Sequence, residues 1–447
     1  MKRIIRAPSL LVLVMIVCFG RFAYAGETIN KHFPDWLEMD LQFRYRYEWK
    51  ANADFNDNID DEKGFSLGRT RINVALVPTD NFRLFYQFQD ARIWSDSKAD
   101  TTSFEDWGET RQLWAQVMTD PEFLDSLLLS KAGIRLGRQE LSYGAQRLIG
   151  GFNWSNTAQT FDAGKVILEF EPAQLSVDIF AGGQTPLKSP REQNDFYDGS
   201  RDDVLAGYYA QYNGLTDITI DQYFLRRDTK GKPVSFGQVG DGEVDDYTLG
   251  IRLKGQVPGT AFDYEFEAAR QWGDSGVLDV NAQMAVVILG YTFDHPWKPR
   301  VAFEFDYASG DNNSTDGKRE TFDNLYPTNH LYYGYMDFAS LQNLNNYHFQ
   351  IKAYPTSQLT LQGDLHFIYL DQPEDNFYSA GRGIQRAGAN SASSHAGNEL
   401  DLLAEYKLND YVSFLAGYSH FFAGDFLKDT GPSDDADFVY AQTVLEF

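Results

Sequence analysis

Hydrophobic and polar residues alternate one by one along much of the chain. In residues 39–50, apolar or aromatic side chains alternate strictly with polar or charged ones. A period of two places alternate side chains on opposite faces of a β-strand, whereas one face of a helix needs a period of 3.6. The alternation returns in residues 82–88, 247–253, 262–268, 301–307 and 412–418. With weaker runs included, the pattern predicts about eighteen strands of roughly ten to fifteen residues, long enough to cross a bilayer at a tilt.

The connections between these segments alternate between short turns and long polar stretches. Short turn-forming sequences occur at 78–81, 171–173, 213–214, 355–357 and 408–410. Long, mostly acidic stretches occur at 51–63, 95–109, 185–202, 228–244, 309–345, 371–397 and 424–436. This sorting predicts an all-β fold, a transmembrane antiparallel β-barrel with short periplasmic turns, long extracellular loops and both termini in the periplasm. The barrel must be closed, because an open edge in lipid leaves backbone groups without hydrogen bonds.

The first 25 residues differ from the rest and predict a cleaved signal peptide. Lys2, Arg3 and Arg6 precede an apolar run of about ten residues, which is too short to span a bilayer. Residues 23–25 (Ala-Tyr-Ala) then match a cleavage site. We therefore expect export to the outer membrane and a single barrel domain over residues 26–447. The only cysteine, Cys18, lies in the predicted signal, so the mature chain has none for disulfides or thiol catalysis.

Composition excludes several classes of protein. The chain has 64 Asp+Glu against 39 Lys+Arg and a formal net charge of −25, which argues against nucleic-acid binding. A mean hydropathy of −0.43 excludes a bundle of membrane-spanning helices. An aromatic content of 15% in so polar a chain is consistent with strands that have one face in lipid.

If the apolar positions face lipid, the opposite positions line the lumen and give it two charged arcs. The predicted basic positions are Arg44, Arg46, Arg69, Arg71, Arg83, Arg135, Arg252 and Lys352. The predicted acidic positions are Asp263, Glu265, Glu267, Glu304, Asp306, Asp364, Asp401 and Glu405. Arginine presents a planar fork for carboxylate or phosphate oxygens and stays charged at any working pH. Charge alone leaves two interpretations open: an anion pathway, or arginines tied to acids across the lumen.

The sequence offers no recognisable catalytic motif, and we expect no enzyme activity, no metal centre and no cofactor. His348 and His366 lie near Asp364 on neighbouring predicted strands, which favours a hydrogen-bonded network over a catalytic site. The segment Asp311–Asp316 has the composition of a calcium loop without the spacing of an EF-hand, so a solvated turn is favoured over bound Ca²⁺. A surface adhesin and a diffusion porin for small sugars or organic acids remain alternatives to an anion pathway. In the second case, Tyr209 and Tyr223 could stack on sugar rings.

Two segments break the alternation and carry a family resemblance. Residues 136–163 (LGRQELSYGAQRLIGGFNWSNTAQTFDA) and 322–338 (FDNLYPTNHLYYGYMDF) resemble the alginate-export family of outer-membrane porins. The resemblance implies a monomeric barrel of eighteen strands with an arginine-rich constriction through which an anionic polysaccharide leaves the cell.

The resemblance also implies roles for particular residues. Arg138, Arg147 and Asp162 would lie at or near the constriction, although alternation alone puts Arg138 on the lipid side of its strand. A bulge near Gly137, or a strand that ends before Arg138, would reconcile the two. Asn329, His330 and Tyr333 would lie on a loop folded towards the pore. The acidic arc departs from the family expectation, because acidic side chains in the lumen do not suit a dedicated exporter of an anionic polyuronate.

The implied partners are the lipid of the outer membrane, an anionic saccharide and, for export, a periplasmic protein. A terminal aromatic residue on an alternating strand, here Phe447, resembles the signal read by the barrel assembly machinery.

Overall fold

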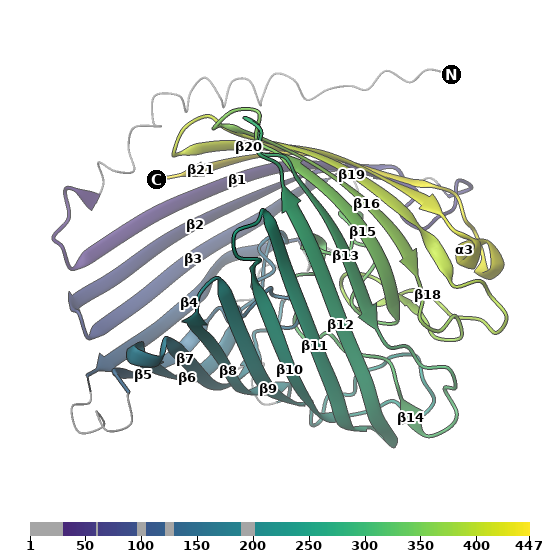
Figure 1. Cartoon of the computed structure of the whole chain (residues 1–447), viewed down its shortest axis with the longest axis horizontal. Helices are drawn as coiled ribbons and strands as arrows, with labels where there is room; N and C mark the ends of the chain where they lie inside the picture. The colour runs from purple at the N-terminus through teal and green to yellow at the C-terminus, as the bar shows by residue number, and fades with distance from the viewer. Residues whose placement is uncertain (1–29, 60, 96–103, 121–128, 189–201) are drawn as a thin grey trace.

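The computed structural model describes residues 30–59, 61–95, 104–120, 129–188 and 202–447, which form one closed antiparallel β-barrel (Figure 1). The predicted signal peptide, residues 1–25, lies outside the described residues. Eighteen long strands form the ring, as predicted. Neighbours in the chain are neighbours in the ring, and the first strand pairs with the last from Gln42 opposite Glu446 to Ala51 opposite Asp437. No described helix is long and apolar enough to span a membrane.

The strands are long, as the alternation predicts, with nine to seventeen residues each. In ring order they are β1 (Leu37–Ala51), β2 (Lys63–Thr79), β3 (Phe82–Ser95), β4 (Asp106–Thr119), β5 (Lys131–Gln139), β6 (Phe161–Phe170), β7 (Leu175–Gln184), β8 (Val204–Leu215), β9 (Ile218–Asp228), β10 (Val244–Gln256), β11 (Phe262–Ser275), β12 (Leu278–Thr292), β13 (Arg300–Ala308), β15 (Leu344–Ala353), β16 (Leu359–Tyr369), β19 (His395–Lys407), β20 (Val412–Ala423) and β21 (Ala436–Glu446).

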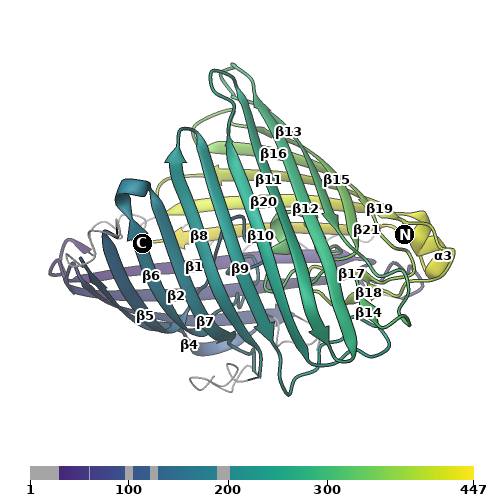
Figure 2. The same cartoon turned by 60° about the horizontal axis from the view of Figure 1, so that its bottom comes forward.

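The polar positions of each strand face the interior of the barrel and the apolar positions face outward. In β1, Arg44, Arg46 and Glu48 are buried, while Tyr45 and Tyr47 between them are only half-buried. Along β11, Phe266 and Trp272 are more than a third exposed, whereas Glu265 and Glu267 are buried. This arrangement is the reverse of a water-soluble sheet and suits a wall in lipid. Figure 2 shows β8 to β12 side by side on one such wall.

The connections give the barrel a short-turn end and a long-loop end. Turns such as residues 80–81 and 408–411, and the 3-10 turn η2 (Glu171–Ala173), join strands at the short-turn end. The long-loop end carries the small elements of the fold, which are β14 (Lys318–Arg319), η3 (Asn329–Leu331), β17 (Phe377–Tyr378), β18 (Ile384–Arg386) and α3 (Asp425–Thr430).

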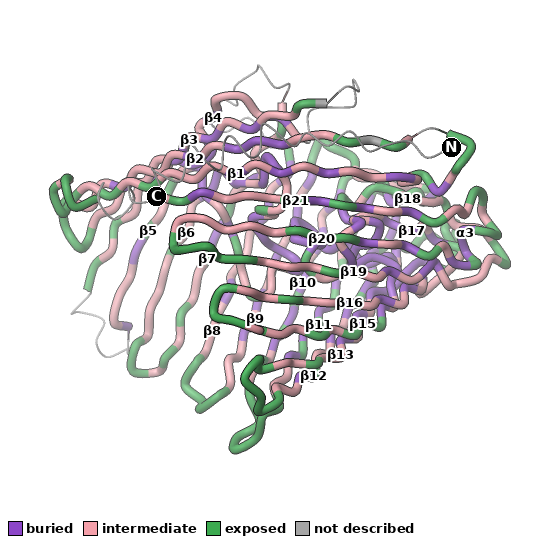
Figure 3. The backbone as a smooth tube through the Cα atoms, turned by 90° about the horizontal axis from the view of Figure 1, so that it is seen from above, coloured by how far each residue is buried: buried purple, intermediate pink, exposed green. Residues whose placement is uncertain are grey.

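Loops from the long-loop end fold into the barrel and build an apolar core there. Phe322, Tyr326 and Phe338 of one loop are at most 4% exposed and pack with Phe426 of α3. Figure 3 shows the buried segments gathered around β17, β18 and α3. These loops therefore occupy the lumen at the long-loop end.

Two details of the connections differ from the prediction. Asn213 and Gly214, predicted as a turn, lie inside β8, because a register shift after Tyr212 moves the turn to residues 216–217. The connection between β11 and β12 at the long-loop end is only residues 276–277 long.

Candidate functional site: the lumen and its crossing loop

Four arginines of β1 and β2 form one patch of the inner surface. Arg44 lies directly opposite Arg69 in the β1–β2 ladder, and Arg46 and Arg71 lie two residues away along their own strands. Strand alternation puts all four on the same face. Each is at most 6% exposed. We call Arg44, Arg46, Arg69 and Arg71 the arginine wall.

The arginine wall is covered by residues 140–160, the connection between β5 and β6, which we call the crossing loop. Arg44 donates hydrogen bonds to the backbone oxygens of Asn153 (2.8 Å) and Ser155 (3.1 Å). Arg69 donates to the same two oxygens at 3.0 and 3.2 Å. Arg71 donates to the side-chain oxygen of Asn153 at 2.8 Å. These acceptors are neutral, so they satisfy donors without cancelling the positive charge.

Arg46 is held differently from the other three. Its Nε donates to Glu48 at 2.6 Å, and its Nη1 donates to the Trp154 backbone oxygen at 2.8 Å. The guanidinium also lies 3.8 Å from the centre of the Trp154 ring, a cation–π contact. The other face of that indole stacks with His330 at 3.9 Å. The Trp154 ring therefore joins the arginine wall to the loop of residues 309–343.

Nearer its start, the crossing loop places Arg147 on the side of the barrel opposite the arginine wall. Arg147 lies 2.6 Å from Glu265, 2.9 Å from Glu267 and 3.3 Å from Glu304, and its side chain is fully buried. Its guanidinium lies 4.5 Å from the Tyr332 ring centre. Burial lowers the pKa of Arg147, but the three carboxylates outweigh it and hold the pKa well above the usual value. We call Glu265, Glu267 and Glu304 the acidic wall.

Other predicted lumen cations are paired or lie towards the short-turn end. Arg252 is ion-paired with Asp221 (2.7 Å) and Glu265 (2.9 Å). Arg135 donates to Gln116 and lies 4.0 Å from the Trp114 ring centre. The remaining two lie near the short turns: Arg83 is paired with Glu38 at 2.6 Å and partly exposed, and Lys352 is near the end of β15.

Arg138 and Asp162 come together, as neighbours in the β5–β6 ladder. They are 2.8 Å apart, and Arg138 is also 3.1 Å from Glu109. Both members of the pair are at most 4% exposed. β5 continues to Gln139, and its pairings show no register shift at Gly137, although Gly137 itself has a φ of 128°. Arg138 is buried, unlike Ile134 and Leu136 on the outward face of the same strand, and its guanidinium is bound by two carboxylates.

The three residues of the second family segment are buried inside the barrel. Asn329 donates to the Ala380 backbone oxygen at 2.7 Å, and His330 Nδ1 lies 2.8 Å from Asp337. Burial lowers the pKa of His330. Tyr333 is 1% exposed. The segment is fixed to the crossing loop by Gly150, whose N–H donates to the Tyr326 oxygen at 2.9 Å.

Several residues of this arrangement were not predicted from the sequence. Arg111 is 3% exposed and donates to Glu140 at 2.6 Å. A register shift between β3 and β4 after Gln87 interrupts the alternation there, so a strict period of two misses this arginine. Burial raises the pKa of Glu140, but Arg111 outweighs burial and the pKa lies below its usual value.

The histidine pair and the segment Asp311–Asp316, which could suggest catalysis and calcium binding, form hydrogen bonds or ion pairs with other groups of the protein. His348 lies 2.9 Å from Asp364 and 3.2 Å from Glu304, and its ring stacks on His366 at 4.0 Å. In the segment Asp311–Asp316, Asp311 accepts the Asn313 backbone N–H at 2.8 Å. No group of three or more His, Cys, Asp or Glu side chains in the described ranges is arranged to hold a metal ion.

A closed ring with a polar interior and an apolar outer wall defines an outer-membrane β-barrel channel. The chain belongs to the alginate export family, whose model matches residues 35–441. It resides in the outer membrane, and the long-loop end is the extracellular end. No curated protein matches the chain.

Solved porins of Pseudomonas aeruginosa share the fold. OccK5 (OpdH) is 11% identical with a TM-score of 0.61 and covers 93% of this chain and 99% of its own. OprD is 11% identical with a TM-score of 0.57, covering 92% and 93%. OpdK, solved with vanillate, is 9% identical with a TM-score of 0.58, covering 93% and 100%.

Proposed function

We propose that this channel passes an anionic saccharide of the polyuronate type outward across the outer membrane. The observation that carries the proposal is the unequal charge balance of the two walls. Arg44, Arg69 and Arg71 donate to neutral oxygens of the crossing loop and of neighbouring glutamines. The three carboxylates of the acidic wall, by contrast, all lie within ion-pair distance of Arg147, and Glu265 is also paired with Arg252. The local field beside the arginine wall is then positive and attracts carboxylates.

The arginine wall also keeps donors for a passing anion. Within the described residues, Arg69 Nε and Arg71 Nη2 are buried and have no hydrogen-bond acceptor. A carboxylate that reaches them would gain charge-assisted hydrogen bonds without breaking an ion pair. Passage also needs binding that is brief. The proposed function is passive and includes no chemical step.

The test is the reversal potential of the purified protein in a planar bilayer under a salt gradient. We expect anion preference in the wild type and block by short polyuronates but not by neutral sugars. The triple variant Arg44→Gln, Arg69→Gln and Arg71→Gln should lower the anion-to-cation permeability ratio at least about threefold and abolish the block. Unchanged selectivity in a correctly folded triple variant would remove these arginines from the mechanism.

A matched control variant removes one positive and one negative charge, so that the net charge of the lumen stays the same. Arg300 and Asp263 form an ion pair of 2.6 Å towards the short-turn end. The double variant Arg300→Gln with Asp263→Asn should keep the selectivity of the wild type. Cation preference without block in the wild type would contradict the proposal.

A second candidate is a diffusion channel for small organic acids. It is favoured by the packed loops inside the barrel at the extracellular end. OpdK, a protein of the same fold, was solved with vanillate, which is a small organic acid. Block by vanillate-sized carboxylates with no effect of polyuronates would favour this candidate.

We further propose that the signal is cleaved after Ala25, that the channel functions as a monomer and that a periplasmic partner delivers the saccharide. Recognition of Phe447 by the assembly machinery also remains a prediction.

A further inference from the structure

The outer wall of the barrel has a hollow lined by residues of β9 to β13. Figure 2 shows the strands β9 to β12 side by side on this wall. The volume of the hollow is about 640 Å³. Small residues, among them Ala268 and Ala285, form its floor, and the exposed side chains of Leu249 and Ile251 form one flank. Because this wall faces lipid, an unfilled hollow forfeits dispersion contacts that an acyl chain can supply.

The upper edge of the hollow carries an arginine on the lipid side. Arg270 is exposed and lies between Ala268 and Trp272 on the outward face of β11. Trp272, Tyr247 and Phe224 form a belt of neighbouring rings above it, with centroids 5.9 to 6.2 Å apart. Such belts mark the membrane interface. Arg270 therefore lies just below the extracellular interface, within reach of lipid headgroups.

Among the described residues, no carboxylate balances the charge of Arg270. Its guanidinium donates to Gln283 at 3.2 Å and to Asn281, both neutral. Two other outward-facing arginines are ion-paired at 2.8 Å, Arg92 with Asp90 and Arg226 with Asp245. In the part of the chain that the structure describes, Arg270 has no carboxylate within ion-pair distance. An unpaired arginine on a lipid-facing strand is unfavourable unless an anion meets it.

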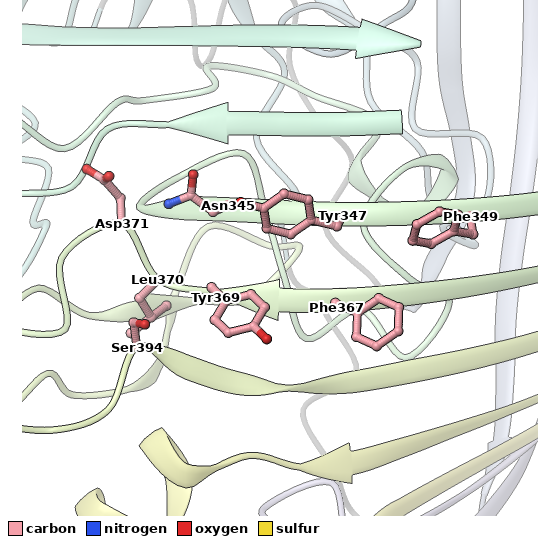
Figure 4. Close-up of a pocket in the computed structure, with 8 residues that line it drawn as sticks. All are labelled: Asn345, Tyr347, Phe349, Phe367, Tyr369, Leu370, Asp371 and Ser394. Carbon is pink, nitrogen blue, oxygen red and sulfur yellow. The ribbon is translucent and has the colours of Figure 1, made fainter. Parts of the chain in front are cut away.

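A second groove lies beside the hollow and continues the apolar surface. Tyr307 lines the hollow, and its partner in the β13–β15 ladder, Asn345, lines the groove. Figure 4 shows the rings of Tyr347, Phe349, Phe367 and Tyr369 along β15 and β16, with Asn345, Asp371 and Ser394 at one end. Its volume is about 700 Å³. One ligand with several acyl chains can therefore occupy both depressions.

We propose that Arg270 and the two depressions bind a phosphorylated, multi-acyl glycolipid of the extracellular leaflet. Its phosphate meets Arg270, one acyl chain fills the hollow over Ala268 and Ala285, and another lies along the ring groove. Arginine suits phosphate because its planar fork matches two oxygens at once. The extracellular leaflet is the source of the lipid, because Arg270 lies next to the extracellular belt.

The test uses the full-length protein delipidated in detergent and then titrated with lipid A, a phosphorylated multi-acyl glycolipid. Bound lipid is counted by native mass spectrometry. We expect one lipid A to bind the wild type, and Arg270→Gln to weaken binding at least about tenfold. Ala285→Phe fills the hollow without changing charge and should also weaken binding. Arg226→Gln alters a paired arginine on the same wall and should bind as the wild type does.

Folding is checked for each variant by the mobility of unheated samples in gels. The proposal is overturned if folded Arg270→Gln and Ala285→Phe bind lipid A as tightly as the wild type. It is also overturned if the wild type binds no lipid A and instead forms dimers that Ala285→Phe abolishes, since a second copy would then occupy the wall.

Discussion

Arginines with identical chemistry serve two purposes in this lumen, and their partners decide which. Arg147 is surrounded by three carboxylates, whereas Arg44 donates to backbone and amide oxygens. A buried charge that loses its partner costs far more than an exposed one, because desolvation is no longer offset. Removing Arg147 must therefore affect stability more than removing Arg44.

We expect Arg147→Met to lower the free energy of unfolding by about 3 kcal/mol, because Glu265, Glu267 and Glu304 would be left close together without a cation. Urea unfolding of the protein in lipid vesicles measures this. Adding Glu267→Gln to Arg147→Met should recover part of the loss by reducing the repulsion. Equal stability of Arg147→Met and the wild type would show that water already compensates the acidic wall.

The sequence predicts only those lumen residues whose inward-facing position follows from strand alternation. Arg44, Arg69, Glu265 and Glu304 follow from a period of two, and the structure puts them where it predicts. Arg111 does not, because a register shift intervenes. The acceptors at residues 153–156 could not be predicted either, since backbone oxygens of a loop carry no sequence signal of their own.

At the level of elements, the crossing loop is the part on which the pathway depends. It is anchored at three places: Glu140 on Arg111, Arg147 on the acidic wall, and residues 153–156 on the arginine wall. The family resemblance identified the segment, but neither pattern nor resemblance predicted that it bridges the two walls. The bridge follows from tertiary contacts between positions more than 80 residues apart.

The Glu140 anchor should make the loop sensitive to acid. Its folded pKa lies below the ordinary 4.5, so its stabilisation is complete above pH 4.5 and is lost as the pH falls through the lower value. The single cysteine of the sequence, Cys18, lies in the predicted signal peptide, so a spin label at Ser142→Cys in the chain without residues 1–25 reports on the exposed start of the loop. We expect the label to become mobile only below about pH 4.5 in the wild type, and already at pH 7 in Glu140→Gln.

The matched control for this experiment is Glu171→Gln in η2, an exposed glutamate paired with Lys131 at the short-turn end. It should leave the mobility of the label unchanged. A label that stays immobile in Glu140→Gln at pH 7 would show that the other two anchors hold the loop alone.

For the whole molecule, closure of the ring by β1 and β21 is the decisive contact. The two strands pair over ten residues, and Phe447 exchanges backbone hydrogen bonds of 2.9 and 3.0 Å with Leu41. The number of strands, their order and their inward faces could be predicted from alternation and loop length, because a barrel in lipid tolerates neither an open edge nor an apolar interior. How its loops pack inside could not, since their apolar residues show no regular period.

Closure and recognition by the assembly machinery can be separated by two substitutions. Ala441→Pro, opposite Tyr47 in the ladder, removes a backbone donor and should prevent the folded, fast-migrating form both in cells and on refolding in detergent. Phe447→Ser should refold normally in detergent but reach the outer membrane of cells in reduced amount. Normal amounts of Phe447→Ser in the membrane would show that the terminal aromatic is not the signal.

The crossing loop has a mechanical consequence as well. β1 and β2 lie about half a circumference away from β11, and the crossing loop binds both sides. It therefore acts as a tie across the ring, opposing any flattening of the circular section by lateral pressure. A barrel braced in this way keeps its bore while the surrounding bilayer changes in thickness or tension.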